Sequence, residues 1–185
     1  MTDTQLPRYY VFKQDAADDP LLNCGSIHAA DPELALLTAR DVFVRRPACI
    51  SLWVVPAAAI LARTAEELVQ ASPDVNADEA TSPKPFAIFV KWEHRGQHAY
   101  SGQLDAVTAE QAITSAWQQY QARSPLVVWV APLNAIVRSQ DDDAESWFSP
   151  ADDKPFRHGN YYHTRSLMRE IQAGTTQGDQ DADES

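Results

Sequence analysis

The feature that most constrains the fold of this chain is a sequence pattern that occurs twice. The segment that begins Gly25-Ser26-Ile27 has a collinear counterpart that begins Gly102-Gln103-Leu104, 77 residues later. The spacing holds through the following helix and then falls to 76. Matched pairs include Phe12 with Phe89, Ala39 with Ala116, Phe43 with Tyr120, Arg46 with Arg123, Trp53 with Trp129, Pro56 with Pro132 and Ile60 with Ile136. A collinear set of this extent indicates an internal duplication, with one residue gained or lost in a loop.

Each copy begins with a predicted β-hairpin. Residues 9–12 and 86–90 are rich in aromatic and β-branched side chains, which is typical of strands. A polar turn follows each of them, and the stretches through Gly25 and Gly102 supply a second strand.

A helix with clear start signals follows each hairpin. Asp31-Pro32-Glu33 offers an N-cap, a proline at the first helical position and an early acidic residue. Its counterpart, Thr108 to Gln111, fits the capping-box pattern. The apolar positions that we expect on the buried helical faces are Ala35, Leu36, Ala39, Val42 and Phe43 in the first copy and Ala112, Ile113, Ala116 and Tyr120 in the second.

The last strand of each copy must be covered on both faces. Residues 50–55 and 126–131 are apolar apart from Ser51, and each run ends at a proline, which cannot donate to a ladder. The helix covers one face, whereas the face that carries Trp53 or Trp129 must be covered by the other copy or by a partner chain. The sequence therefore predicts an α+β fold of two tandem strand-strand-helix-strand repeats, each a small antiparallel sheet with one helix, plus an extended C-terminal arm.

Composition shifts predict where these parts begin and end. A stretch with two Ser-Pro pairs and several acidic residues suits an exposed linker, and the acidic end of the chain suits disorder. The expected organisation is a first repeat at 1–70, a linker at 71–85, a second and more divergent repeat at 86–140, a docking arm at 141–168 and a disordered acidic tail at 169–185.

The net charge of −11 argues against nucleic acid and anionic membranes as partners. No apolar run approaches the roughly 20 residues that a membrane-spanning helix needs, and the polar N-terminus lacks a signal-peptide core. We therefore expect a cytoplasmic protein. Cys24 and Cys49 could pair in an oxidising compartment, but two idle thiols are the favoured interpretation.

The sequence lacks the common catalytic signatures. It contains no glycine-rich nucleotide-binding motif, no Cys-x-x-Cys pair and no Glu-x-x-His pair of the kind that di-iron enzymes use, so we expect no cofactor and no metal site. His94 and His98 are expected in a polar hairpin turn rather than on a metal. The Asp141–Asp143 run is interpreted as a solvated loop rather than a calcium site, and His28 as an exposed polar residue.

Aromatic residues, prolines and arginine crowd into one segment after both copies are complete. This segment runs from Trp147 to Tyr162 and is too short to form a core of its own. It must lie across its own domain or across another protein, and the sequence does not choose between them.

Two sets of residues resemble the B subunits of phenylacetyl-CoA epoxidase complexes, which are encoded with aerobic phenylacetate degradation. One is the first repeat, from Tyr10-x-Phe12 through Gly25-Ser26-Ile27-His28 to Ser51-Leu52-Trp53. The other is the tail pattern Phe148-x-Pro150-Ala151-x-Asp153-Lys154-x-x-Arg157-His158-x-x-Tyr161-Tyr162. The resemblance implies a non-catalytic bridging component of a multicomponent oxygenase. A sister subunit would carry the di-iron centre and bind the CoA thioester, and a reductase would deliver electrons from NADPH. The partners that the resemblance implies are the catalytic and the structural subunit of the di-iron oxygenase, called the catalytic pair below.

The resemblance also suggests which residues bind partners. We expect structural or docking roles for Arg40, Arg45, Arg46, Trp53, Phe148, Asp153, Lys154, Arg157, His158 and Tyr161. The usual family member has a single copy, so the tandem chain is expected to mimic a homodimer. Two alternatives stay open: a free-standing α+β domain that binds a small ligand between its repeats, and the equivalent subunit of an oxygenase for another aromatic CoA thioester.

Overall fold

The computed structural model describes residues 6–44, 49–70, 82–139, 144–149, 168–169 and 171. The chain divides into two units, residues 1–151 and 152–185, and each is considered by itself. In the second unit only Met168, Arg169 and Ile171 are described, and they are helical. Everything that follows concerns the first unit.

The elements between residues 8 and 70, called the first half below, begin with a hairpin and a helix. They are β1 (Arg8–Gln14), β2 (Leu22–His28), α1 (Pro32–Phe43), β3 (Ser51–Pro56), the short 3₁₀ turn η1 (Ala57–Ala59), β4 (Leu61–Thr64) and α2 (Ala65–Gln70).

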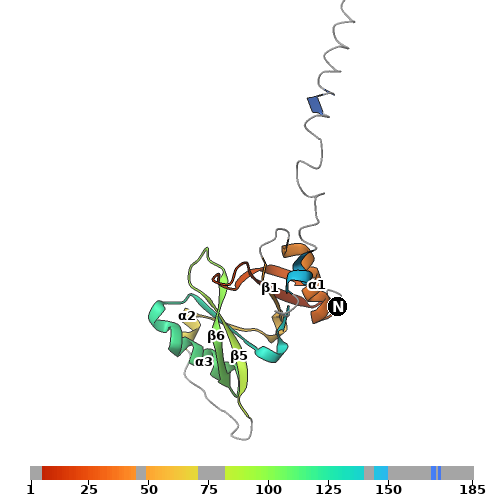
Figure 1. The fold of residues 1–185 in the computed structure, drawn as a ribbon. Helices are drawn as coiled ribbons and strands as arrows, with labels where there is room; N and C mark the ends of the chain where they lie inside the picture. Colours follow the sequence, from red (N-terminus) through yellow and green to blue (C-terminus); the bar gives the residue numbers. More distant parts are fainter. Residues whose placement is uncertain are drawn as a thin grey trace, which may run out of the picture. The chain divides into compact units, whose positions relative to one another are not determined.

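The elements between residues 84 and 148, called the second half, follow the same order. They are β5 (Lys84–Lys91), β6 (His98–Ala106), α3 (Ala109–Tyr120), η2 (Gln121–Arg123), β7 (Val127–Pro132), η3 (Leu133–Ala135), β8 (Val137–Arg138) and α4 (Ala144–Phe148). Figure 1 shows β5 and β6 side by side with α3 along them, and α1 beside β1.

All eight described strands belong to one antiparallel sheet, in the order β4-β7-β5-β6-β2-β1-β3-β8. The predicted α+β class is confirmed. The sequence did not predict that the strands of both halves would join in a single sheet. The junction is the pair β2 and β6, where Leu22 lies opposite Ala99.

The inner face of the sheet closes around a core that both halves share. Phe12 of β1 and Phe89 of β5 stack with their ring centroids 4.2 Å apart. These strands are three places apart in the sheet, which would separate them by roughly 14 Å if the sheet were flat. The sheet must therefore curve strongly, and the two halves face each other.

This shared core, called the central cluster below, answers what covers the inner face of the last strands. Its buried members are Phe12, Leu21, Val55, Ala87, Phe89 and Ala131, and its partly buried members include Tyr10, Trp53, Ile60, Tyr100, Trp129, Leu133 and Ile136. Trp53 and Trp129 both belong to it, so within the described chain each half covers the other. The first of the two possibilities from the sequence is confirmed.

Each half also lends its last strand to the other half. β4 of the first half pairs with β7, and β8 of the second half pairs with β3. The two exchanges match in register. Leu61 lies opposite Val130 and Val137 lies opposite Val54, and the equivalent residues, Leu61 with Val137 and Val54 with Val130, are each 76 positions apart. The strands β3 and β7 are therefore each covered along one side by a strand of the other half.

Two glycines explain why the hairpins are built alike. Gly25 and Gly102 have φ angles of 146° and 134°, a region that L side chains rarely adopt. Each lies where its hairpin register shifts, at Val11/Phe12 and at Ile88/Phe89. The positive φ at the bulge favours glycine in both copies, and at Gly25 a Cβ atom would in addition lie only 2.9 Å from the Phe43 ring.

The two helices cover the outer face of the sheet, each over a core of its own. The predicted caps are confirmed: Asp31 accepts from Leu34 N at 2.7 Å, and Thr108 accepts from Gln111 N at 3.1 Å. Ala35, Ala39, Ala112, Ile113 and Ala116 are fully buried as expected. Val42, which the sequence placed on the buried face, is 38% exposed, because it lies at the border of that face.

Candidate protein-binding surfaces

Three of the ten residues with an expected docking or structural role lie in the described part of the chain. They are Arg40, Trp53 and Phe148. The other seven fall outside the described residues, so their roles stay predictions: Arg45, Arg46, Asp153, Lys154, Arg157, His158 and Tyr161.

Phe148, the last residue of the second half, packs into the outer core of the first half. It lies on α4 and is only 6% exposed, packed in the cluster that also holds Val11, Ala39 and Leu52. The start of the predicted docking arm therefore lies on its own domain. Phe148 can stabilise this position, but it offers little surface to another protein.

Arg40 holds the same helix from the other side. Its guanidinium lies 5.1 Å from the ring centroid of Trp147, and its Nε is 3.4 Å from a carboxylate oxygen of Asp41. A cation above an indole face is attracted by the ring quadrupole. Arg40 is therefore engaged within the chain, where it fastens α4 against α1.

Trp53 lines a shallow pocket at the end of the central cluster. The Trp53 indole packs against Tyr100, with ring centroids 5.0 Å apart. The Arg138 guanidinium lies 5.8 Å from the centroid of the Trp53 ring. The pocket has a volume of about 320 Å³ and is lined by Trp53, Pro85, Leu133, Asn134, Ile136 and Arg138. It is mainly apolar and carries one exposed cation.

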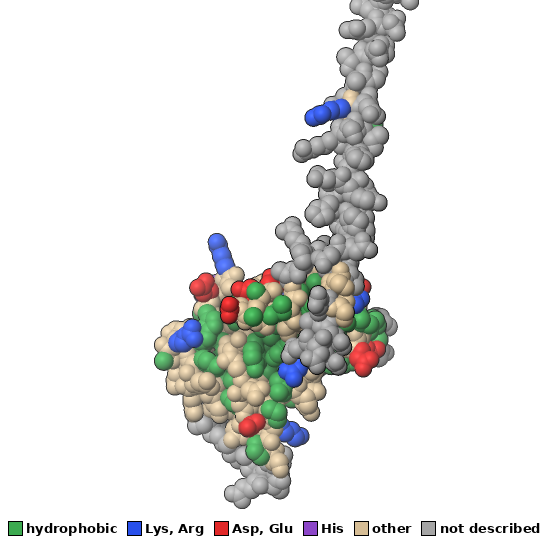
Figure 2. All heavy atoms as spheres, in the orientation of Figure 1, with side chains coloured by type: hydrophobic (Ala, Val, Ile, Leu, Met, Phe, Trp, Pro, Cys, Tyr) green, Lys and Arg blue, Asp and Glu red, His purple; other side chains and the backbone are tan. Residues whose placement is uncertain are grey.

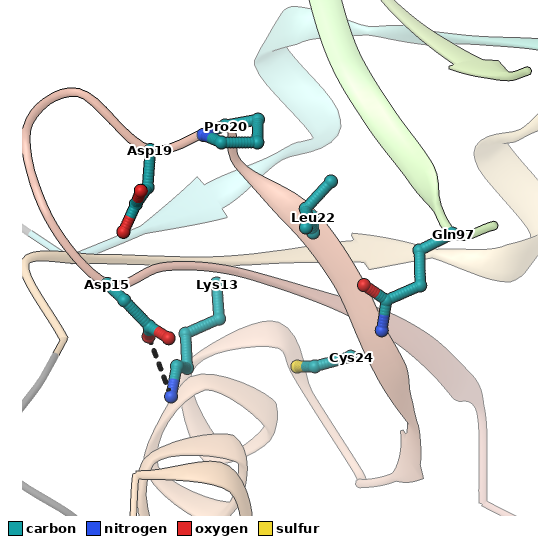
Figure 3. Close-up of a pocket in the computed structure, with 7 residues that line it drawn as sticks. All are labelled: Lys13, Asp15, Asp19, Pro20, Leu22, Cys24 and Gln97. Carbon is teal, nitrogen blue, oxygen red and sulfur yellow. Dashed lines mark ion pairs between the residues drawn. The ribbon is translucent and has the colours of Figure 1, made fainter.

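A second pocket, of about 310 Å³, contains the thiol of Cys24 (Figure 3). Lys13 and Asp15 form an ion pair of 2.7 Å at its edge, and Gln97 reaches it from the second half. Burial raises the pKa of Cys24 to about 11 and that of Cys49 to about 12. Both thiols are thus protonated near neutral pH and are poor nucleophiles.

His98 is also held in a structural contact. Its ring stacks on Trp129 with centroids 3.6 Å apart, and burial followed by the nearby Lys91 charge lowers its pKa to about 4. His94 lies exposed in the turn between β5 and β6, whereas His98 begins β6. His28 is exposed as expected, with Nδ1 2.7 Å from the carbonyl oxygen of Leu6. Among the described residues no three potential ligands gather into a metal-binding group.

A pair of exposed leucines on α1 is a surface feature that the sequence did not single out. Leu34 and Leu37, on the outer side of α1, are 44% and 43% exposed. Figure 2 shows hydrophobic side chains at the edge of the molecule where Figure 1 places α1, next to acidic side chains. Two leucines three positions apart on the polar side of a helix were the available signal.

Comparison with known proteins identifies the family. A family model described as Phenylacetic acid degradation B matches residues 5–77 and 83–168. The chain belongs to this family. The B subunit of the 1,2-phenylacetyl-CoA epoxidase of Escherichia coli (strain K12) is 40% identical over 67 residues, which are 36% of this chain and 70% of that protein. No solved structure matches the chain.

The family match extends over both halves of this B-family protein. The match includes the second half, although its residues differ from the motifs of the first half. It also runs on to residue 168, past the last described residue of the first unit. In the described part of this B-family chain, no helix is both long and apolar enough to cross a bilayer.

Proposed function

We propose that this chain is a non-catalytic structural component of a multicomponent phenylacetyl-CoA epoxidase whose di-iron site lies on another chain. The observation that carries the proposal is the match of one B-subunit family to both halves of the chain. The named relative, the B subunit of the E. coli enzyme, supports the same assignment.

The surroundings of the reactive side chains favour a structural role over catalysis. Cys24 and Cys49 have raised pKa values, and His98 is stacked on an indole with a pKa of about 4. A general base works best when its pKa lies near the working pH, and a cysteine nucleophile must be able to ionise. These three side chains meet neither requirement.

We infer further that the tandem chain takes the place of a dimer of single-copy subunits. Leu22 pairs with Ala99 and Phe12 stacks on Phe89, and in both pairs the partners are 77 positions apart. Contacts between equivalent positions are what a two-fold axis produces in a homodimer. Sedimentation of the purified chain should give the mass of one chain; a mainly dimeric species would contradict this inference.

Affinity purification from the native host tests the assignment directly. A tagged chain should recover a di-iron oxygenase subunit, identified by mass spectrometry, and the charge reversal Arg157→Glu should reduce the yield of that complex. An unchanged yield would count against Arg157 as a docking residue. If the wild-type chain recovers no oxygenase subunit, the proposed function itself is contradicted.

The ligand-binding alternative predicts a cavity between the halves. In the described chain the middle of that space is occupied by the aromatic side chains of the central cluster, and only the two open pockets of about 310 and 320 Å³ described above lie at its margins. Isothermal titration of phenylacetyl-CoA into the isolated chain should therefore show no binding. Binding, or turnover with NADPH by the isolated chain, would favour the alternative. Product analysis of the reconstituted complex would identify which aromatic CoA thioester it oxidises.

A further inference from the structure

The outer faces of α1 and α3 occupy corresponding places in the two halves but differ in chemistry. Leu34 and Leu37 on α1 correspond to Gln111 and Thr114 on α3, 77 positions later. The two leucines are exposed to more than two fifths. In the region where Figure 1 places α3, Figure 2 shows mainly backbone and side chains that are neither hydrophobic nor charged.

Gln111 and Thr114 on α3 make hydrogen bonds within the helix and with the residues just before it. Gln111 Oε1 accepts a hydrogen bond from Val107 N at 2.8 Å, and Thr114 Oγ1 donates to the carbonyl of Glu110 at 2.9 Å. Covering such a surface with a partner would therefore contribute little to the free energy of binding. The leucines on α1 are in the opposite position, because their exposed area is unfavourable in water and is stabilised when a partner buries it.

We propose that the outer face of α1, centred on Leu34 and Leu37, binds the catalytic oxygenase subunit, and that the corresponding face of α3 binds none. The proposal rests on the function proposed above and adds to it. It makes the chain a one-sided component that holds one catalytic pair, rather than a symmetric bridge between two.

The charges around the leucines indicate what kind of surface would cover them. Asp31, Glu33 and Asp41 are exposed on the same helix, and Arg40 is turned toward Trp147 and Asp41. In a two-fold contact between copies the same patch faces itself, so these carboxylates would meet carboxylates on chains that each carry a charge of −11. A different protein, with an apolar recess bordered by lysine or arginine, is the complementary occupant.

The test compares matched variants on the two helices. Leu34→Gln with Leu37→Thr gives α1 the residues of α3, and Thr114→Ala with Gln118→Ala changes the outer face of α3. The probe is the purified catalytic di-iron subunit pair from the same host. The α1 variant should bind it roughly ten- to a hundredfold more weakly, and the α3 variant within about twofold of the wild type.

Stoichiometry and salt dependence add two independent readouts. Light scattering should give one catalytic pair per chain, and affinity should fall as salt rises from about 0.05 to 0.5 M. Two pairs per chain, or equal losses in both variants, would overturn the one-sided assignment. An affinity that does not change with salt would contradict the lysine or arginine border proposed for the partner's recess.

Other occupants of the α1 face give results that can be recognised. If a second copy covers it, the wild type sediments as a dimer and the α1 variant as a monomer. If another part of the chain covers it, the α1 variant melts several degrees lower while binding is unchanged. Either result overturns the proposal, and circular dichroism checks that the variant folds. A wild-type chain that binds no catalytic pair overturns the proposed function, and the α1 assignment with it.

Discussion

The two halves of this protein agree where they face each other and differ where they face outward. In the central cluster Phe12 corresponds to Phe89 and Trp53 to Trp129, whereas Tyr10 and Tyr100 correspond to Ala87 and Asn23. On the outer helices, leucines on α1 correspond to glutamine and threonine on α3. A close-packed interior restricts every side chain that enters it, whereas an outer surface is restricted only by what it must bind. The outward differences are therefore the place to look for function.

The helix ends show the same contrast in another form. In the first half Arg40 lies over Trp147, a residue of α4, whereas in the second half Arg123 lies over Trp92, with 4.3 Å between guanidinium and ring centroid. Both halves thus carry an arginine on a tryptophan, but at positions that do not correspond. Only in the first half does this contact fasten the segment that leads into the C-terminal arm.

The largest effect should come from the shared core. Phe12→Ala and Phe89→Ala should each lower the free energy of unfolding by about 4 kcal/mol, because both rings are fully buried in the same stack. Urea unfolding followed by fluorescence measures this, and both variants should unfold in one transition. Effects that differ by more than about 1 kcal/mol would argue against an equal sharing of the central cluster.

The helices that follow the exchanged strands provide the next comparison. Phe148→Ala on α4 should cost about 3 kcal/mol, and Leu68→Ala on α2 about 2 kcal/mol, because each side chain is buried in the outer core of one half. Thermal unfolding measures both. If Phe148→Ala leaves stability unchanged and weakens only complex formation, its role as a core residue is wrong.

The two bulge glycines should differ in a defined direction. A Cβ atom at Gly25 would lie 2.9 Å from the Phe43 ring, whereas one at Gly102 would meet only Tyr120, at 3.5 Å. Both substitutions strain the backbone, so Gly102→Ala should cost about 1–2 kcal/mol, and Gly25→Ala about 1 kcal/mol more. Chemical denaturation ranks them; the reverse order would mean that the Phe43 ring moves aside at little cost.

The smallest effect concerns the pH dependence of stability. His98 corresponds to Leu21 in the first half, and its pKa falls from 6.5 to about 4 on folding. The unfolded chain therefore binds this proton more readily, so stability is lost as pH falls from about 6.5 toward 4. His98→Leu should flatten that part of the stability profile in acid titrations. If the slope of stability against pH is unchanged in this variant, the loss of stability in acid is due to other groups.

The sequence predicted much of the local structure. The order of elements, the helix caps at Asp31 and Thr108 and the strands ending at prolines all appear in the structure. Burial at the helix border was less predictable, since Val42 lies where the buried and exposed faces meet. The exposed leucines of α1 were visible in the sequence, yet their significance depended on knowing which side of the helix faces the sheet.

Local hydrogen bonds and hydrophobic periodicity are contained in short windows, and these the sequence determined by itself: the strand-strand-helix-strand order, its repetition and the need to cover Trp53 and Trp129. The tertiary structure decided which surfaces meet. The pairing of β4 with β7 and of β8 with β3 joins residues more than sixty positions apart, and no local pattern specifies such a partner. An apolar strand face shows that it must be buried, but only the folded chain shows what buries it.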